Sequence, residues 1–246
     1  MGCGNSSSAG AKEEDTKNEK KAYHEMSEEE KAKIKKELEE SDKKLKDETK
    51  KEDPAAAASW KFDKIKELPV ETTDEARKKR LKLWNQINEY GNGYVSYKRL
   101  DVQLSKYLGM PLTIREKGPI RLAFNGACNR YAKKGANAND GLLEWMEFRI
   151  FLVYLRQYFE YYAIFTKIDT SGDNKISLEE FKKAIPTMNN YNVKIEEKDA
   201  EKVFKGIDKD NSGSISFKEF CTYAIEKSLN LEDDSFDDEE LKNLKK

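Results

Sequence analysis

The chain has 246 residues, of which 38% are charged and 37% hydrophobic, and its 46 basic residues nearly balance its 47 acidic ones. This balance argues against general nucleic-acid binding, which usually shows a basic excess, and no apolar stretch is long enough to span a membrane. One histidine and three cysteines without framework spacing argue against a zinc site or a disulfide framework and fit a reducing cytosol.

The first residues, Met-Gly-Cys-Gly-Asn-Ser, match a lipidation pattern. Gly2 followed by Ser6 fits the N-myristoylation motif, and Cys3 beside it is a usual palmitoylation position. One myristate gives only about 10⁴ M⁻¹ of membrane affinity, so stable attachment needs a second chain or a polybasic patch. Acidic residues balance the lysines of residues 12–21. We therefore expect residues 1–10 to be an acylation signal, with myristate on Gly2 and palmitate on Cys3.

Residues 11–58 form a leader rich in lysine and glutamate. Ser27 and Glu30 have the spacing of a capping box, which predicts an exposed helix beginning there. The segment has too little apolar surface to fold independently. We expect a mostly disordered or partly helical, solvated spacer, with a coiled coil as the alternative, and a boundary at Asp53-Pro54.

Two later stretches, residues 88–99 and 136–147, share one spacing. Each has glycine at its sixth position, Gly93 or Gly141, and an apolar residue at its eighth, Val95 or Leu143. Apolar residues at helical spacing flank both stretches. We expect each stretch to be the loop of a helix–loop–helix unit; we call them loops one and two.

The same spacing recurs in residues 169–180 and 208–219, loops three and four, now with oxygen-bearing side chains. Oxygen ligands at positions 1, 3, 5, 7, 9 and 12 characterise the calcium-binding EF-hand loop. The expected ligands are Asp169, Ser171, Asp173, the carbonyl of Lys175, Ser177 and Glu180 in loop three, and Asp208, Asp210, Ser212, the carbonyl of Ser214, Ser216 and Glu219 in loop four.

The sixth position of these loops must accept a left-handed backbone. Gly213 does so in loop four, and Asn174, one of the residue types that best tolerate this conformation, stands there in loop three. Each loop carries three ligand carboxylates. That charge count predicts dissociation constants on the order of 10⁻⁷ to 10⁻⁵ M for Ca²⁺.

Loops one and two have lost their ligands. Asn88, Tyr90 and Arg99 replace the expected oxygens of loop one, and Ala136 and Ala138 remove those of loop two. We expect no calcium in either. The predicted fold is all-α and calmodulin-like, with two lobes of paired EF-hand units, residues 59–155 and 156–228, short β bridges between paired loops, and an acidic tail at 229–246. No nucleophile–base pair or phosphate-binding glycine loop stands out, so we do not expect an enzyme.

The acylation signal, charged leader, two degenerate hands and two intact ones together resemble the flagellar calcium-binding proteins, or calflagins. The local likeness extends through residues 60–65 (WKFDKI), 147–149 (EFR) and 184–186 (AIP). The resemblance implies lipid on Gly2 and Cys3, calcium in the last two hands, and a location on the cytoplasmic face of the flagellar or ciliary membrane.

The expected function is that of a membrane-tethered calcium sensor. Calcium would reorient the helices of the second lobe and expose apolar surface from Phe181, Met188 and Tyr223 to an unidentified protein partner. The membrane, through myristate and palmitate, is the second expected partner, and nucleic acid is not one. The alternatives are a calcium buffer that barely opens and a calcium-responsive regulatory subunit of an enzyme.

Overall fold

The computed structural model describes residues 26–45, 63–89, 91–111, 118–130, 141–189 and 194–227. The expected acylation signal with Gly2 and Cys3, the boundary at Asp53-Pro54 and the acidic tail lie outside these residues. Within the described part of the chain, no helix has the length and apolar character needed to cross a membrane.

The elements are helices joined through two pairs of three-residue strands. In chain order they are α1 (Glu28–Lys44), α3 (Asp63–Lys66), α4 (Asp74–Ile87), β1 (Tyr94–Ser96), α5 (Tyr97–Leu108), α7 (Pro119–Arg130), β2 (Leu142–Glu144), α8 (Trp145–Ile168), β3 (Lys175–Ser177), α9 (Leu178–Met188), the 3₁₀ turn η3 (Glu197–Asp199), α10 (Ala200–Ile207), β4 (Ser214–Ser216) and α11 (Phe217–Glu226). The predicted all-α, EF-hand architecture is confirmed.

Paired loops are joined by the expected β bridges. Strand β1 runs antiparallel to β2 with Val95 opposite Leu143, and β3 runs antiparallel to β4 with Ile176 opposite Ile215. All four of these side chains are fully buried. Because each stands at position eight of its loop, the bridges fix the loops in pairs and direct apolar side chains into the lobes.

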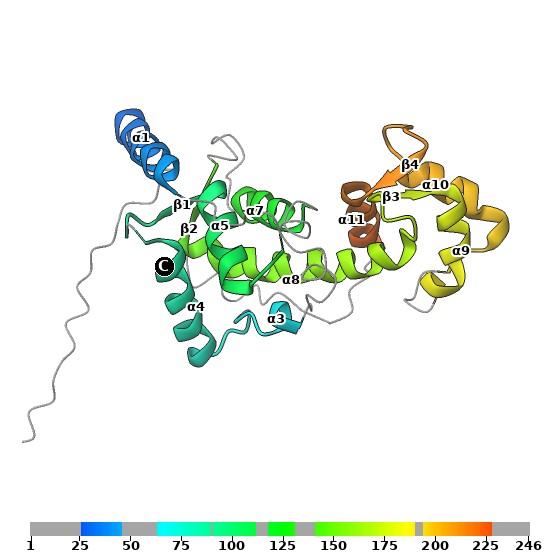
Figure 1. Ribbon diagram of the computed structural model, residues 1–246, viewed down its shortest axis with the longest axis horizontal. Coiled ribbons are helices and arrows are strands. Elements are labelled where there is room, and N and C mark those ends of the chain that lie inside the picture. Colours follow the sequence, from blue (N-terminus) through cyan, green and yellow to red (C-terminus); the bar gives the residue numbers. More distant parts are fainter. Residues whose placement is uncertain are drawn as a thin grey trace, which may run out of the picture.

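Helix α8 connects the two lobes without a break (Figure 1). It contacts α3, α4 and α7 on the amino-terminal side, and α9 and α11 on the carboxyl-terminal side. Phe148 lies 5.1 Å from Trp84 between ring centroids, and Phe165 lies 5.4 Å from Phe217. One hydrophobic core therefore continues from the first lobe into the second, and the expected division at residues 155 and 156 falls inside this helix.

Helix α1 begins where the sequence predicts. Ser27 and Glu30 form the reciprocal bonds of a capping box, with the Ser27 backbone N–H donating to Glu30 Oε2 at 2.7 Å. The sequence predicted a helix exposed to solvent, but Leu38 is only 3% exposed and packs against Tyr94 and Leu142 of the first bridge. The leader helix is therefore in contact with the amino-terminal lobe.

Truncating Phe148 should destabilise the amino-terminal lobe. The side chain is fully buried, so we expect Phe148→Ala to lower the free energy of unfolding by about 3–5 kcal/mol. Chemical denaturation followed by tryptophan fluorescence measures this, since Trp84 is in ring contact with Phe148. Met146→Ala, on the same helix but 46% exposed, should change stability by less than about 0.5 kcal/mol. Equal effects of the two substitutions would contradict this description of the core.

Candidate metal centre

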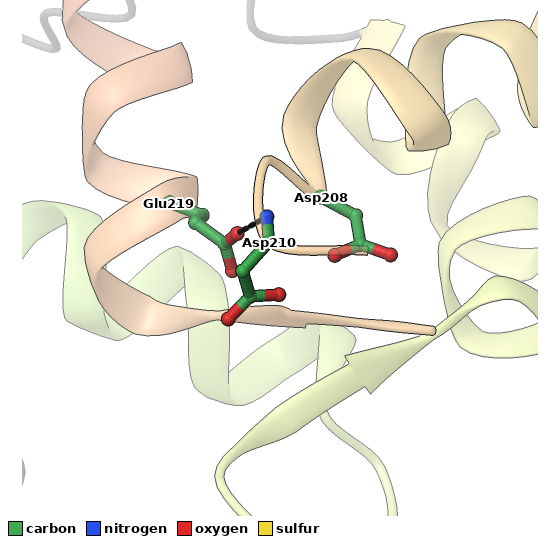
Figure 2. Close-up of side chains that lie close together, drawn as sticks. All are labelled: Asp208, Asp210 and Glu219. Atoms are coloured by element: carbon green, nitrogen blue, oxygen red, sulfur yellow. Dashed lines mark hydrogen bonds between the residues drawn. The ribbon is translucent and has the colours of Figure 1, made fainter. Parts of the chain in front are cut away.

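Loop four brings its three carboxylates together. Ligand oxygens of Asp208, Asp210 and Glu219 all lie within 4.8 Å of one another. Asp208 caps the end of α10 and Glu219 lies in the first turn of α11, so the loop between these helices converges on one point (Figure 2). Three carboxylates and nearby hydroxyl and carbonyl oxygens are the donor set that suits Ca²⁺.

Hydrogen bonds from the loop backbone hold these carboxylates in place. Asp208 accepts from the N–H of Ser212 and of Gly213, each at 2.9 Å. Glu219 accepts from the Lys209 N–H at 2.8 Å and from the Ser216 N–H at 2.9 Å. The loop is thus folded around the side chains that would bind the cation.

The charge of Glu219 is maintained by the same contacts. Burial raises the pKa of its carboxyl group, but hydrogen bonds from Ser216, Lys209 and Asp210 outweigh burial and lower the pKa below the ordinary value. Glu219 is therefore ionised at neutral pH, as a calcium ligand must be.

Loop three has the same closure at its two ends. Asp169 accepts from the N–H of Gly172 at 2.7 Å and of Asn174 at 2.9 Å. Burial raises the pKa of Glu180, but hydrogen bonds from Ser177, Ser171 and Thr170 outweigh it and bring the pKa down to about 2. Both end carboxylates are thus fixed within the loop.

The middle of loop three differs from loop four. Asp173 accepts from the Lys175 N–H at 2.9 Å and is exposed. Among the described residues, three carboxylates meet within 4.8 Å in loop four and not in loop three. The carboxylates of loop four stand at positions one, three and twelve, whereas those of loop three stand at positions one, five and twelve, so the two loops distribute their negative charge differently.

The remaining expected ligands also lie in these two loops. Ser177 and Ser216, at position nine, each donate a hydroxyl hydrogen bond to the glutamate at position twelve. Lys175 and Ser214 begin strands β3 and β4, and the Ser214 carbonyl accepts from the Ser212 hydroxyl at 2.9 Å. Ser171 donates its hydroxyl to Asp169 at 3.1 Å.

The sixth positions take the left-handed conformation that the sequence predicted. The backbone φ is 65° at Asn174 and 81° at Gly213. Asparagine is one of the few residues with a Cβ that adopts this conformation readily. The turn of loop three is therefore retained without a glycine at this position.

The degenerate loops use their positions differently. Asn88 is a buried helix cap, and Glu147 accepts a hydrogen bond from the Glu144 N–H at 2.9 Å. Tyr90, Ala136 and Ala138 lie outside the described residues.

Arg99 is buried and paired with Asp42 of α1, a contact that the sequence analysis missed. The cation at the twelfth position of loop one was the one local signal that could have led to it.

Two family models of known proteins match segments of the chain that contain these loops. A family model described as the FCaBP EF-hand domain matches residues 65–155, and one described as an EF-hand domain pair matches residues 158–225. The first match contains loops one and two, and the second contains loops three and four.

Two trypanosome proteins are similar to the chain over most of its length. The flagellar calcium-binding protein of Trypanosoma cruzi is 30% identical over 168 residues, which are 68% of this chain and 79% of that protein. The flagellar calcium-binding protein TB-17 of Trypanosoma brucei brucei is 31% identical over 173 residues, or 70% of this chain and 73% of that protein.

Replacing Glu219 should remove calcium binding from loop four. Glu219→Gln keeps the size of the side chain but loses its charge and one ligand oxygen, so we expect the affinity of this site to fall at least about tenfold, or ~1.4 kcal/mol. Isothermal titration calorimetry would show one strong site where the wild type has two. Glu226→Gln, an exposed glutamate of the same helix, is the control and should titrate like wild type. Two unchanged sites in Glu219→Gln would show that this residue is not a ligand.

Proposed function

Because this chain belongs to the family of flagellar calcium-binding proteins, we propose that it is a membrane-tethered calcium sensor of the flagellum. The observation that carries the proposal is the convergence of Asp208, Asp210 and Glu219 in a loop that is bridged to a second loop of the same kind. The twelfth residue of each loop lies in the first turn of the following helix, so cation binding acts directly on α9 and α11.

Glu180 connects loop three to helix α9. Its two oxygens accept hydrogen bonds from Thr170, Ser171 and Ser177 in the structure. Bound calcium supplies the positive charge that compensates the carboxylates of the loop. For Glu180 to present both oxygens as ligands, it has to exchange some of these hydrogen bonds, and α9, which begins at Leu178, moves with it.

A cavity between α8, α9 and loop three, lined half by apolar and half by polar side chains, is the surface that this movement would enlarge. It measures about 110 Å³, and Ile164 and Ile168 of α8 line it together with Ala184 and Met188 of α9. Glu180 lines the same cavity, so a calcium ligand and the apolar wall belong to one unit. This arrangement favours a sensor over a buffer, because a shift of α9 opens apolar surface to a protein partner.

The membrane half of the proposal rests on the amino terminus. Gly2 and Cys3 fit a dual-acylation signal, and two lipid chains are sufficient for stable attachment where one is not. The relatives are named for the flagellum. We place the protein on the cytoplasmic face of the flagellar membrane, with the carboxyl-terminal lobe available to its partner.

Calcium should increase the apolar surface of the carboxyl-terminal lobe. Phe181, Met188 and Tyr223 are buried in the structure, so a hydrophobic dye should bind weakly without calcium and fluoresce more strongly with it. Glu180→Gln should remove most of the rise, and Glu179→Gln, at an exposed neighbouring position, should keep it. Calcium binding by calorimetry with no change in dye fluorescence would support the buffer alternative.

Removing the acylated residues should release the protein from membranes. We expect wild type in the membrane fraction of cells, Gly2→Ala in the soluble fraction, and Cys3→Ala with strongly reduced retention, because a single myristate binds only weakly. Fractionation with and without calcium, with mass spectrometry of the amino terminus, measures this. Ser7→Ala lies outside the motif and serves as the control. A soluble wild type with an unmodified terminus would rule out the tether.

A further inference from the structure

The outer face of the first β bridge carries two large apolar side chains, whereas that of the second carries none. Successive side chains of a strand point to opposite faces, so Tyr94 and Leu142 lie on the face opposite the core residues of their bridge. Both occupy the seventh position of their loops. The corresponding residues of loops three and four are Lys175, which is exposed, and Ser214. Loops one and two therefore carry an apolar surface that the calcium loops do not have.

Helix α1 covers this surface (Figure 1). Leu38 packs on Tyr94 and Leu142, which are only 4% and 5% exposed. Ile34, one turn earlier on the helix, and Met26 pack against the same group. Met26, Ile34 and Leu38 of the leader therefore meet the apolar residues of the bridge.

Arg99 provides a charged anchor beside this apolar contact. It stands at the twelfth position of loop one and is 1% exposed. Its Nε lies 3.3 Å from Oδ1 of Asp42, and its Nη2 donates to the Ser41 hydroxyl at 3.1 Å. Glu89, preceding the bridge, lies 3.7 Å from Nη1. A buried guanidinium needs such partners, since burial of a charge without them is strongly unfavourable.

Other residues of loop one hold the same end of α1. The Ser96 hydroxyl, at position nine, donates to Oδ2 of Asp42. Lys98 Nζ donates to the Asp42 backbone carbonyl at 2.7 Å. Asp42 lies in the last turn of α1, where a cation interacts favourably with the carbonyl groups at the helix end. Positions nine, eleven and twelve of a loop that lacks the expected calcium ligands thus all contact Asp42.

We propose that loops one and two together form a docking site for the leader helix, with Arg99 holding Asp42 and with Tyr94 and Leu142 receiving Leu38. Most helical stability in proteins comes from packing of an apolar face, so docking should stabilise α1 as a helix. None of these contacts involves loops three and four, so the helix stays docked with or without calcium. The docking does not depend on the sensor proposal, but it shortens any membrane tether to the residues preceding α1.

Hydrogen exchange by mass spectrometry on the full chain tests the docking. Amides of α1 should exchange far more slowly than those of an unstructured peptide, equally with and without calcium. Asp42→Asn should accelerate their exchange at least roughly tenfold, because it removes one partner of a buried ion pair. Glu40→Gln makes the same charge change at an exposed position of the same helix and should alter exchange by less than about twofold.

A second variant separates docking from damage to the lobe. Arg99→Gln should release α1 to a similar extent, and the double variant Asp42→Asn/Arg99→Gln should exchange little faster than either single one, because all three lose the same contact. If Arg99→Gln also exposes the amides of α8, the lobe itself has been perturbed and Asp42→Asn decides, since it changes no residue of the lobe, provided that the amides of α8 keep their wild-type exchange in it.

Three results would overturn the proposal. One is exchange of wild-type α1 at the rate of an unstructured peptide. Another is an Asp42→Asn variant that exchanges like Glu40→Gln. The third is protection of α1 that appears only at high protein concentration, because the helix would then be docked on a second copy of the chain.

Discussion

Both lobes depend on the burial of aromatic side chains from the two ends of helix α8. Phe148 packs with Trp84 in the first lobe, and Phe165 packs with Phe217 in the second. Because α8 is continuous, core contacts in both lobes hold it in place, including the end that leads into loop three. Loop three therefore follows a helix that is packed in the core along its length, and α9 follows loop three.

The residue at the twelfth position of each loop determines what the loop does. Glu180 and Glu219 bring a carboxylate back into their own loops, where it accepts backbone hydrogen bonds and is ionised. Glu147 caps its helix. Arg99 is directed to a carboxylate of the leader. Side chains at one structural position thus make contacts within their own loop, at the start of the following helix or with the leader, depending on their charge and length.

Much of the fold and the site follows from local spacing. The turns at Asn174 and Gly213, the strand pairs centred on position eight, and the capping box at Ser27 each depend on residues a few positions apart. Such features were predictable because backbone sterics and short-range hydrogen bonds determine them. The burial of Leu38 was not, since it depends on contacts with Tyr94 and Leu142, which lie far along the chain.

By itself, the sequence determined the four loops, the loss of ligands in the first pair and the oxygen donors of the second, because loop chemistry depends on residue type at fixed spacing. Only the tertiary structure decided that α8 unites the lobes in one core and that α1 lies on the first bridge. The contact between Ser96 and Asp42 joins residues 54 positions apart. Contacts of that range depend on which surfaces meet after folding, and a lysine- and glutamate-rich leader carries no local signal of where its few apolar side chains will pack.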